Sequence, residues 1–393
     1  MSSRFTQLTR STATLHAGLP VLLVLGVAVV ASVLSLRYFY LAWAWTALAW
    51  AIALAMSAWM IQRQWLRLLL VNLAAVCLTF MLAEIWFSPA LSAPDDVYSG
   101  DYMGEYFVDH PLLGYGPKVD FRARSTRSVD GEIVYDTLYS INSDGRRITP
   151  QATEADRAVL VFGGSFTFGE GVQDAEAMPY RFGELAGSGY QVYNFGFHGY
   201  GPHQMLAALE FSLADKATDL PVSHVIYQTI PDHVHRAAGR AFWDKSGPRY
   251  ELTAAGDAVF AGHFDDGKGA IRKALPDLLN KSQLYRRLFG VQQELSQADV
   301  QLYAGIVERA QQLVQQNYPQ AEFHVLLWGY PGSDAFEMVS GALASRDIKV
   351  HPVIDILPYY ANEAQRYELH PQDTHPNALA HDEIARYLAE EIL

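Results

Sequence analysis

Three apolar segments occupy the first 87 residues and constrain the fold more than any other feature of the chain. Leu19–Leu36, Tyr38–Ile61 and Leu66–Phe87 are almost free of charge. Each is close to the roughly 20 residues that a helix needs to cross a bilayer. Buried core helices are the alternative, but three such segments in tandem favour a membrane. We therefore predict an N-terminal membrane region, residues 1–89, with three transmembrane helices.

Arginines around these segments predict an orientation. Arg4 and Arg10 precede the first segment, Arg63 and Arg67 separate the second from the third, and Arg37 stands alone between the first two. Because basic residues collect on the cytoplasmic side, the N-terminus is expected inside and the chain after the third segment outside. This predicts a multi-pass protein of the bacterial inner (cytoplasmic) membrane with a periplasmic or extracellular domain.

The chain outside the membrane region is acidic. Five arginines and Glu84 give residues 1–89 a charge of +4, so the whole-chain charge of −13 leaves −17 for the rest. A surface of this sign is not suited to binding nucleic acid. Cys77 is the only cysteine and lies in the third apolar segment. An intrachain disulfide is therefore excluded, as is a thiol nucleophile in the exported part.

The run Val159–Gly171, with the sequence VLVFGGSFTFGEG, contains a candidate nucleophile. A short apolar strand breaks at Gly163 and Gly164, and Ser165 follows. Glycines allow a sharp turn and remove the side chains that would keep a substrate from the hydroxyl. The G-x-S-x-G elbow of α/β-hydrolases is excluded because Thr167 stands where its second glycine would be. The alternative is an ordinary turn after a core strand.

A partner for this serine occurs near the end of the chain. Asp373 and His375 are separated by one residue and precede a segment with helical apolar spacing that includes Ile384 and Leu388. A carboxylate there can orient the imidazole, which can take the proton of a serine. The alternative is a capped helix start, with Asp373 or Asn377 accepting from free backbone amides.

Four short blocks, in this order, resemble the signature blocks of the SGNH, or GDSL-like, hydrolase superfamily. They are Gly163–Phe166, Asn194–Gly201, Pro231–His233 and Asp373–His375. The resemblance implies a three-layer α/β/α domain with a mostly parallel sheet and no cofactor or catalytic metal. It further implies that Ser165 is the nucleophile, His375 the base and Asp373 its orienting carboxylate, with the amides of Ser165 and Gly199 in the oxyanion hole.

The sequence departs from the family pattern at three places, one of them in the last block, where a single residue separates Asp373 from His375 instead of the usual two. Gly164 stands where the family has aspartate, and Asp232 stands where it has the oxyanion-hole asparagine. A carboxylate cannot donate a hydrogen bond unless it is protonated. Three hypotheses follow: His233 supplies the donor, burial keeps the Asp232 carboxyl neutral, or the site is not a standard esterase site.

Strand-like and helix-like segments alternate over residues 158–393, which predicts a parallel sheet covered by helices. One of the predicted strands is Val353–Leu357, after a helix at Asp334–Ser345. Residues 90–157 are predicted to form a small β-rich leader that packs on this core. An insertion at about residues 237–288 is predicted either to form a lid or substrate-binding element, or to be a surface excursion with a small hairpin.

Histidines allow a metal-site hypothesis. One group is an H-x-H pair, and the other is a set of histidines near Asp373 in the sequence. The two regions would have to lie together in the fold to bind zinc or manganese. The absence of H-E-x-x-H argues against this, and His370 and His381 are predicted to be surface or capping residues. The histidines concerned are His233, His235, His370, His375 and His381.

These patterns predict a membrane-anchored serine esterase or O-acyltransferase. Its predicted substrates are ester-linked acyl groups, O-acetyl groups among them, on an envelope glycan or a lipid. Three spans are more than an anchor needs, which suggests a membrane-protein partner besides the lipid bilayer. The alternative is a non-catalytic membrane protein that binds acylated glycan or forms a complex; Asp232 favours it, whereas Ser165, Asp373 and His375 oppose it.

Overall fold

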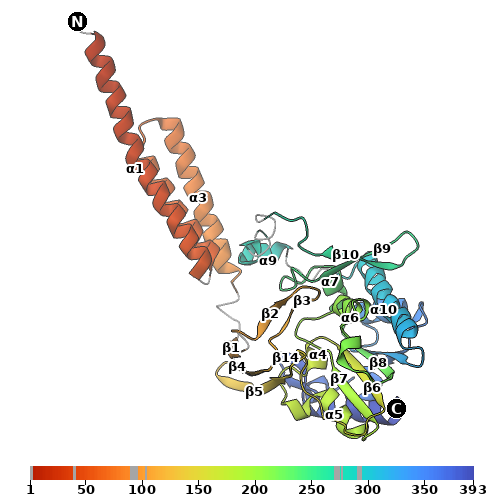
Figure 1. Ribbon diagram of the computed structural model, residues 1–393. Helices are drawn as coiled ribbons and strands as arrows, with labels where there is room; N and C mark the ends of the chain where they lie inside the picture. The colour runs from red at the N-terminus through yellow and green to blue at the C-terminus, as the bar shows by residue number, and fades with distance from the viewer. Residues whose placement is uncertain are drawn as a thin grey trace. The chain divides into compact units, whose positions relative to one another are not determined.

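The computed structural model describes residues 3–38, 41–88, 96–101, 104–269, 275, 278–289 and 294–393. The chain divides into two compact units, which are treated separately below (Figure 1). The helical unit comprises Met1–Ala93 and Gly269–Gln293, and the sheet unit comprises Pro94–Lys268 and Glu294–Leu393.

Three long helices make up most of the helical unit: α1 (Ser3–Tyr38), α2 (Ala42–Met60) and α3 (Gln64–Trp86). Each contains a stretch long and apolar enough to cross a membrane, namely Leu19–Arg37, Ala42–Met60 and Gln64–Trp86. Many of their large apolar side chains are exposed, which suits a hydrocarbon environment rather than water. The prediction of three apolar helices before the α/β domain is confirmed.

The predicted insertion at residues 237–288 is divided between the two units. Its first part contains a hairpin of the sheet unit, but residues 269–293 group with the three apolar helices. There, helix α9 (Gln283–Phe289) begins at the carboxylate of Glu84 on α3, which accepts from the Gln283 amide at 2.8 Å and from the Ser282 hydroxyl. A buried carboxylate in an apolar helix needs such partners, which explains the return of the chain.

The sheet unit is built on five strands, in the order β12-β11-β8-β6-β7. All of the strand pairs are parallel. Strand β6 (Arg157–Gly163) lies between β8 and β7 and carries apolar side chains on both faces, as expected for a sheet covered on both sides. The others are β7 (Tyr190–Asn194), β8 (Val222–Thr229), β11 (Glu322–Leu327) and β12 (Val350–Pro352).

Helices cover both faces of this sheet and bury two separate apolar clusters. Helices α6 (Pro202–Glu210), α10 (Gln297–Asn317) and α11 (Asp334–Ala344) pack over Leu160 and Phe162. Helices α5 (Met178–Leu185) and α13 (Ala378–Glu391) pack over Val159 and Val161 on the other face. Figure 1 shows α6 and α10 on one side of β6 and α5 on the other. The predicted three-layer α/β/α fold with a parallel sheet is confirmed.

One predicted strand is wrong. Val353–Leu357 begins with a helical turn, α12 (Val353–Ile356), in which the Leu357 amide donates to the Val353 carbonyl at 3.0 Å. The strand lies just before it, because Pro352 ends β12 and cannot donate to a further ladder bond. The turn places Val353 and Leu357 together in the core, since residues four apart share one helix face.

The segment before β6 contributes antiparallel strands to the sheet unit. Strands β1 (Asp96–Gly100), β4 (Phe121–Val129) and β5 (Glu132–Ile141) form one sheet, and β2 (Phe107–His110) pairs with β3 (Gly114–Pro117). Aromatic side chains from this segment pack against the loop after β7, through Tyr106, Tyr139 and Phe197. The segment therefore belongs to the same compact unit as the α/β core.

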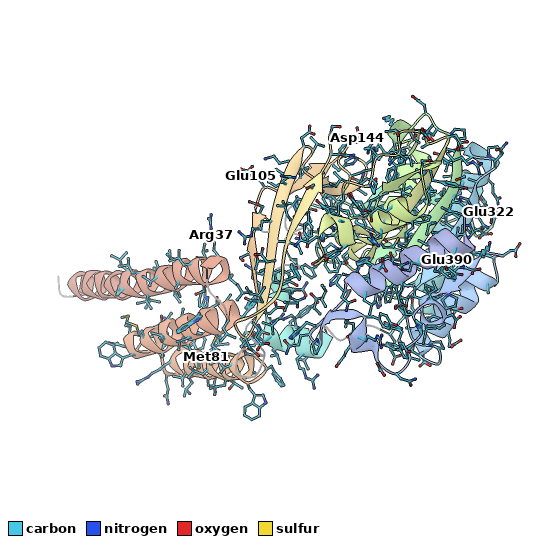
Figure 2. All side chains as sticks on the ribbon, turned by 90° about the horizontal axis from the view of Figure 1, so that it is seen from below. Arg37, Met81, Glu105, Asp144, Glu322 and Glu390 are labelled. Atoms are coloured by element: carbon cyan, nitrogen blue, oxygen red, sulfur yellow. The ribbon has the colours of Figure 1, made fainter. Side chains whose placement is uncertain are left out.

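Acidic side chains extend from the surface of the sheet unit, among them Glu105, Asp144, Glu322 and Glu390 in Figure 2.

Short elements complete the described chain. The hairpin β9 (Pro248–Leu252) and β10 (Ala258–His263) packs on α10, and β13 (Glu368–His370) pairs with β14 (Asp373–Pro376). The remaining short helices are α4 (Ser165–Phe168), α7 (His233–Ala237), η3 (Asp174–Glu176), η4 (Asp215–Ala217) and η5 (Ala364–Arg366).

Candidate active site

Ser165 lies where strand β6 turns into a helix. Strand β6 ends at Gly163, and Ser165 is the first residue of α4. A Cβ at Gly163 would collide with the Thr167 hydroxyl and lie 2.7 Å from the Gln228 carbonyl oxygen. Only glycine therefore allows this turn, which brings the serine to the carboxyl edge of the parallel sheet, where sites of such folds form.

Asp373 and His375 lie on strand β14, which leads directly into α13. The predicted helix cap is Asn377, whose side chain accepts from the Ala380 amide at 3.1 Å. Asp373 is therefore not used as the cap. Its Oδ1 lies 2.6 Å from His375 Nδ1, and His375 Nε2 lies 2.8 Å from Ser165 Oγ. The three residues that the sequence predicted as a catalytic set form one continuous hydrogen-bonded line.

Arg127 of strand β4 supports the carboxylate at the end of this line. Its Nη1 lies 2.5 Å from Asp373 Oδ2, and its Nε and Nη2 each lie 2.9 Å from the carboxylate oxygens of Asp96. Both Arg127 and Asp373 are buried. The guanidinium thus fixes the outer oxygen of Asp373 while the inner one orients His375.

Glu170 supplies a second carboxylate near the imidazole. This buried side chain places Oε2 2.6 Å from His198 Nδ1 and 3.7 Å from His375 Nε2. Burial lowers the pKa of His198, so a neutral His198 with its proton on Nδ1 donates to Glu170. The Glu170 carboxylate is therefore held beside the base, and the backbone amide of Glu170 donates to the Ser165 carbonyl oxygen at 3.0 Å.

These neighbours set the protonation of the base. Burial lowers the pKa of His375, but the charge of Glu170 and the hydrogen bond and charge of Asp373 outweigh it and raise the pKa above its usual value. For Asp373, burial raises the pKa, while His375 and Arg127 outweigh this and lower it. The carboxylate is therefore ionised at neutral pH, and the imidazolium that forms on proton transfer is stabilised.

A cavity of about 580 Å³ opens onto Ser165 and His375. Gly199 lines it in a left-handed conformation with φ 73°, and a Cβ there would lie 2.5 Å from Trp243 Nε1 and 2.6 Å from the Tyr115 hydroxyl. Glycine is therefore required at this position. The cavity is lined by Phe107, Tyr115, Ser165, Glu170, His198, Gly199, Arg236, Trp243 and His375.

Asp232 and His233, the two candidate donors of the third sequence block, lie outside this lining. Asp232 has a side chain that is 48% exposed, and its Oδ2 accepts from Arg236 Nε at 2.9 Å. The hypothesis of a carboxyl kept neutral by burial required a buried side chain, so the structure contradicts it. His233 is buried, with Nδ1 2.7 Å from the Tyr227 hydroxyl. Burial holds the pKa of His233 well below its usual value.

The predicted histidine groups do not come together as a metal site. Among the described residues, no group of three histidine, cysteine, aspartate or glutamate side chains is arranged to hold a metal ion. His370 Nδ1 accepts from the Gln372 amide at 3.2 Å, and His381 Nδ1 accepts from the Met178 amide at 3.0 Å. His381 thus caps the start of α5, although it is fully buried rather than on the surface.

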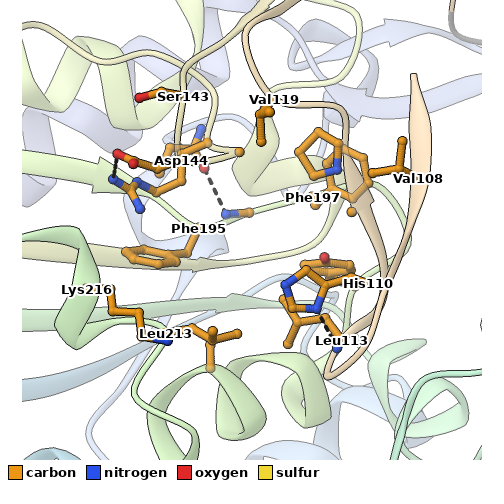
Figure 3. Close-up of a pocket in the computed structure, with 18 residues that line it drawn as sticks. Val108, His110, Leu113, Val119, Ser143, Asp144, Phe195, Phe197, Leu213 and Lys216 are labelled. Carbon is orange, nitrogen blue, oxygen red and sulfur yellow. Dashed lines mark hydrogen bonds and ion pairs between the residues drawn. The ribbon is translucent and has the colours of Figure 1, made fainter. Parts of the chain in front are cut away.

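A second cavity of about 350 Å³ lies in the sheet unit, on the loop after β7 (Figure 3). Its lining combines His110 and Leu113 of the leader with Phe195 and Phe197 of that loop. Neither Ser165 nor His375 contributes to it. It is therefore separate from the hydrogen-bonded line described above.

Sequence reasoning missed several residues of the site, although two of them carried a signal. Glu170 is the one charged residue in the run Val159–Gly171. Arg127 shares the alternating buried face of β4 with Ala123 and Val129. A charged side chain at a buried position needs a partner of opposite charge or a hydrogen-bonding group beside it. Trp243 lies in the predicted insertion at residues 237–288, for which a substrate-binding element is one of the alternatives, and its side chain lines the cavity.

The comparisons with known proteins found matches to solved structures alone. No protein-family model matches this sequence, and no curated protein does. A lipolytic protein of the G-D-S-L family from Desulfitobacterium hafniense is 10% identical, with 59% of this chain and 97% of that chain covered and a TM-score of 0.34. An arylesterase from Agrobacterium tumefaciens is 13% identical, with 60% and 98% covered and a TM-score of 0.34.

A third match covers more of the chain. An acetyl xylan esterase from the rumen bacterium Butyrivibrio proteoclasticus is 9% identical, with 77% of this chain and 98% of that chain covered and a TM-score of 0.34. Of these three proteins, the one from Desulfitobacterium hafniense is described as a member of the G-D-S-L family.

Proposed function

We propose that the protein is a membrane-anchored serine esterase or O-acyltransferase with Ser165 as its nucleophile. The observation that carries the proposal is the unbroken line of hydrogen bonds from Ser165 Oγ through His375 to Asp373. It supports acyl chemistry because a serine hydroxyl is a weak nucleophile until an oriented base can take its proton. The cavity over Ser165 provides space for an ester.

The chemistry follows from these positions. Ser165 Oγ forms a bond to the ester carbonyl carbon, its proton passes to His375 Nε2, and the π electrons move to the carbonyl oxygen. When the carbonyl re-forms, the bond to the alcohol oxygen breaks, and that oxygen takes the proton from His375. Water then attacks the acyl-serine by the same steps and releases the acid. In acyl transfer, the hydroxyl of an acceptor takes the place of water.

The proposed substrates are ester-linked acyl groups, including O-acetyl groups, of an envelope glycan or a lipid. Aromatic side chains of Phe107, Tyr115 and Trp243 line the cavity, and such surfaces pack against sugar rings or acyl chains. We place the sheet unit on the periplasmic or extracellular side of the inner membrane. The distribution of arginines around the three apolar helices supports this orientation.

Ester hydrolysis by the full-length chain in detergent tests the proposal. The full chain is used because residues 269–293 of the later sequence belong to the helical unit. p-Nitrophenyl acetate and longer-chain esters are offered to the wild type, Ser165→Ala and His375→Ala. We expect hydrolysis that falls by about 10⁴-fold or more in either variant. Equal rates in all three folded proteins would refute Ser165 as the nucleophile.

A further inference from the structure

Two departures from the family pattern meet at one side chain, Arg236. Gly164 replaces the aspartate before the nucleophile, and Asp232 replaces the oxyanion-hole asparagine. The two positions are far apart in the sequence, but the guanidinium of Arg236 pairs with Asp232 and occupies the space where a side chain at Gly164 would begin. The structure thus connects two substitutions that appear independent when the sequence is read alone.

The contact with Asp232 fixes one edge of the guanidinium. Helix α7 places Arg236 one turn after Asp232, and Arg236 Nε donates to Asp232 Oδ2 at 2.9 Å. The carboxylate at the former asparagine position therefore does not face the cavity as a donor. Instead, the Asp232 carboxylate accepts a hydrogen bond from the positively charged guanidinium of Arg236.

The contact with Gly164 explains the missing side chain before Ser165. A Cβ at Gly164 would lie 2.9 Å from Arg236 Nη1, 3.0 Å from the Tyr200 carbonyl oxygen and 3.1 Å from His233 Nε2. An aspartate there would have to displace the guanidinium. Glycine therefore leaves the space that Arg236 occupies, directly beside the backbone of the nucleophile.

The guanidinium also joins the second sequence block. Arg236 Nη1 donates to the Tyr200 carbonyl at 2.9 Å, which fixes the chain next to Gly199. Arg236 is only 7% exposed, yet it lines the cavity together with Ser165 and Gly199. Within the described residues, no protein group accepts a hydrogen bond from its Nη2. A buried cationic group with a spare donor thus borders the space over the nucleophile.

We propose that Arg236 stabilises the oxyanion with a positively charged hydrogen-bond donor, in place of the neutral amide donor that an asparagine side chain supplies in the family pattern. This inference rests on the proposed function, because the oxyanion forms only when Ser165 attacks a carbonyl. Negative charge that develops on the carbonyl oxygen is then met by the Ser165 and Gly199 amides and by the guanidinium. A preorganised cation beside the nucleophile stabilises such charge without having to reorganise.

The competing role for a buried arginine is binding of an anionic group on the substrate. The two roles make different predictions for a neutral ester. An anion-binding arginine is not needed for p-nitrophenyl acetate, because that substrate carries no charge. An oxyanion-stabilising arginine is needed for every ester, since each forms the same charged intermediate.

The test compares Arg236→Ala and Arg236→Lys with wild type, Ser165→Ala and the control Arg240→Ala, all full length in detergent. Arg240 is the neighbouring arginine, pairs with Asp299 and is not part of the cavity lining. We expect Arg236→Ala to lower kcat for p-nitrophenyl acetate by about 10²–10³-fold with little change in KM, and Arg236→Lys to lower it less. Circular dichroism checks that each variant is folded.

Chemical rescue adds a readout that a merely structural role would not move. Millimolar guanidinium chloride, with sodium chloride at equal ionic strength as control, should restore part of the kcat of Arg236→Ala and none of that of Ser165→Ala. If Arg236→Ala keeps the wild-type kcat, or only raises KM for anionic esters, Arg236 is not the oxyanion donor, although Ser165 remains the nucleophile.

A second measurement is used if the wild-type protein hydrolyses none of the test esters. The rate of labelling by a fluorophosphonate also depends on charge at an oxygen over Ser165, so Arg236→Ala should label more slowly than Arg240→Ala. Equal labelling rates would overturn the role of Arg236 alone. No labelling of the folded wild type would overturn both this role and the proposed function.

Discussion

The two sides of Ser165 are built in different ways. On the base side, Asp373 and His375 come from one short strand and match a motif that the sequence displays. On the oxyanion side, Gly199 and Arg236 come from separate segments, and the position expected to supply a donor holds Asp232 instead. A motif in the sequence therefore indicates residues that lie close together in the chain. It does not indicate Arg236, which reaches the cavity only through the packing of α7.

The two sides also differ in charge. The base side has two buried carboxylates, Asp373 and Glu170, balanced in part by Arg127. The oxyanion side has one cation, Arg236, held by a half-exposed carboxylate. Negative charge next to the imidazole favours its protonation, and positive charge near the carbonyl oxygen favours the oxyanion. The negative groups thus lie beside the imidazole that becomes positive in the proposed reaction, and the positive group lies beside the carbonyl oxygen that becomes negative.

The largest effect on the base side is expected from Asp373→Asn. The amide keeps the size of the side chain but no longer fixes the His375 tautomer with its proton on Nδ1. Loss of this orientation costs about 10⁴-fold in kcat in serine hydrolases of the same design. Steady-state kinetics with p-nitrophenyl acetate measure it, and Glu390→Gln on the exposed side of α13 is the control. A loss of less than tenfold would show that another group orients His375.

An intermediate effect is expected from Arg127→Gln. Arg127 lowers the pKa of His375 in the wild type, so its removal raises that pKa further. The base is then neutral only at higher pH, and the acidic limb of the kcat/KM profile moves to higher pH. Loss of one partner from a buried ion pair should also lower the free energy of unfolding by about 3 kcal/mol.

Arg124→Gln is the matched control for Arg127. It lies on the same strand and pairs with Asp136, but its side chain is 64% exposed. We expect an unchanged pH profile and a change in unfolding free energy below about 1 kcal/mol. Identical pH profiles for Arg127→Gln and the control would remove Arg127 from the account of the base side.

The smallest effect on rate is expected from Glu170→Gln. The amide oxygen can still accept from His198, but the charge near His375 is gone. Because Glu170 raises the pKa of His375, its removal lowers that pKa. The acidic limb of kcat/KM should therefore move to lower pH, opposite to the shift for Arg127→Gln. A shift in the same direction for both variants would contradict the electrostatic description of the base.

Much of the fold and the base side could be predicted from the sequence, because the signals are local. The turn at Gly163 and Ser165, the pair Asp373 and His375, and the alternating strands and helices are each contained in a short stretch. The partners of Arg127 and Arg236 depend on strand register and on helix position. Those are fixed only when the leader and α7 pack on the core.

The same distinction explains the errors in the fold. Val353–Leu357 has a strand-like composition, but Pro352 and core packing turn it into a helical turn. Residues 269–293 show no strong pattern in the sequence, and the start of α9 is tied to α3 by the bonds of Ser282 and Gln283 to Glu84. A single charged residue in an apolar helix is a signal, although it does not say which segment will pair with it.

Labelling of the full-length protein by a fluorophosphonate tests the central claim most directly. The labelled residue is identified by mass spectrometry in the wild type, Ser165→Ala and His375→Ala. We predict that the label is on Ser165 in the wild type, is lost in Ser165→Ala and forms far more slowly in His375→Ala. Labelling of another residue, or equal labelling of all three folded proteins, would contradict the claim that Ser165 is the nucleophile.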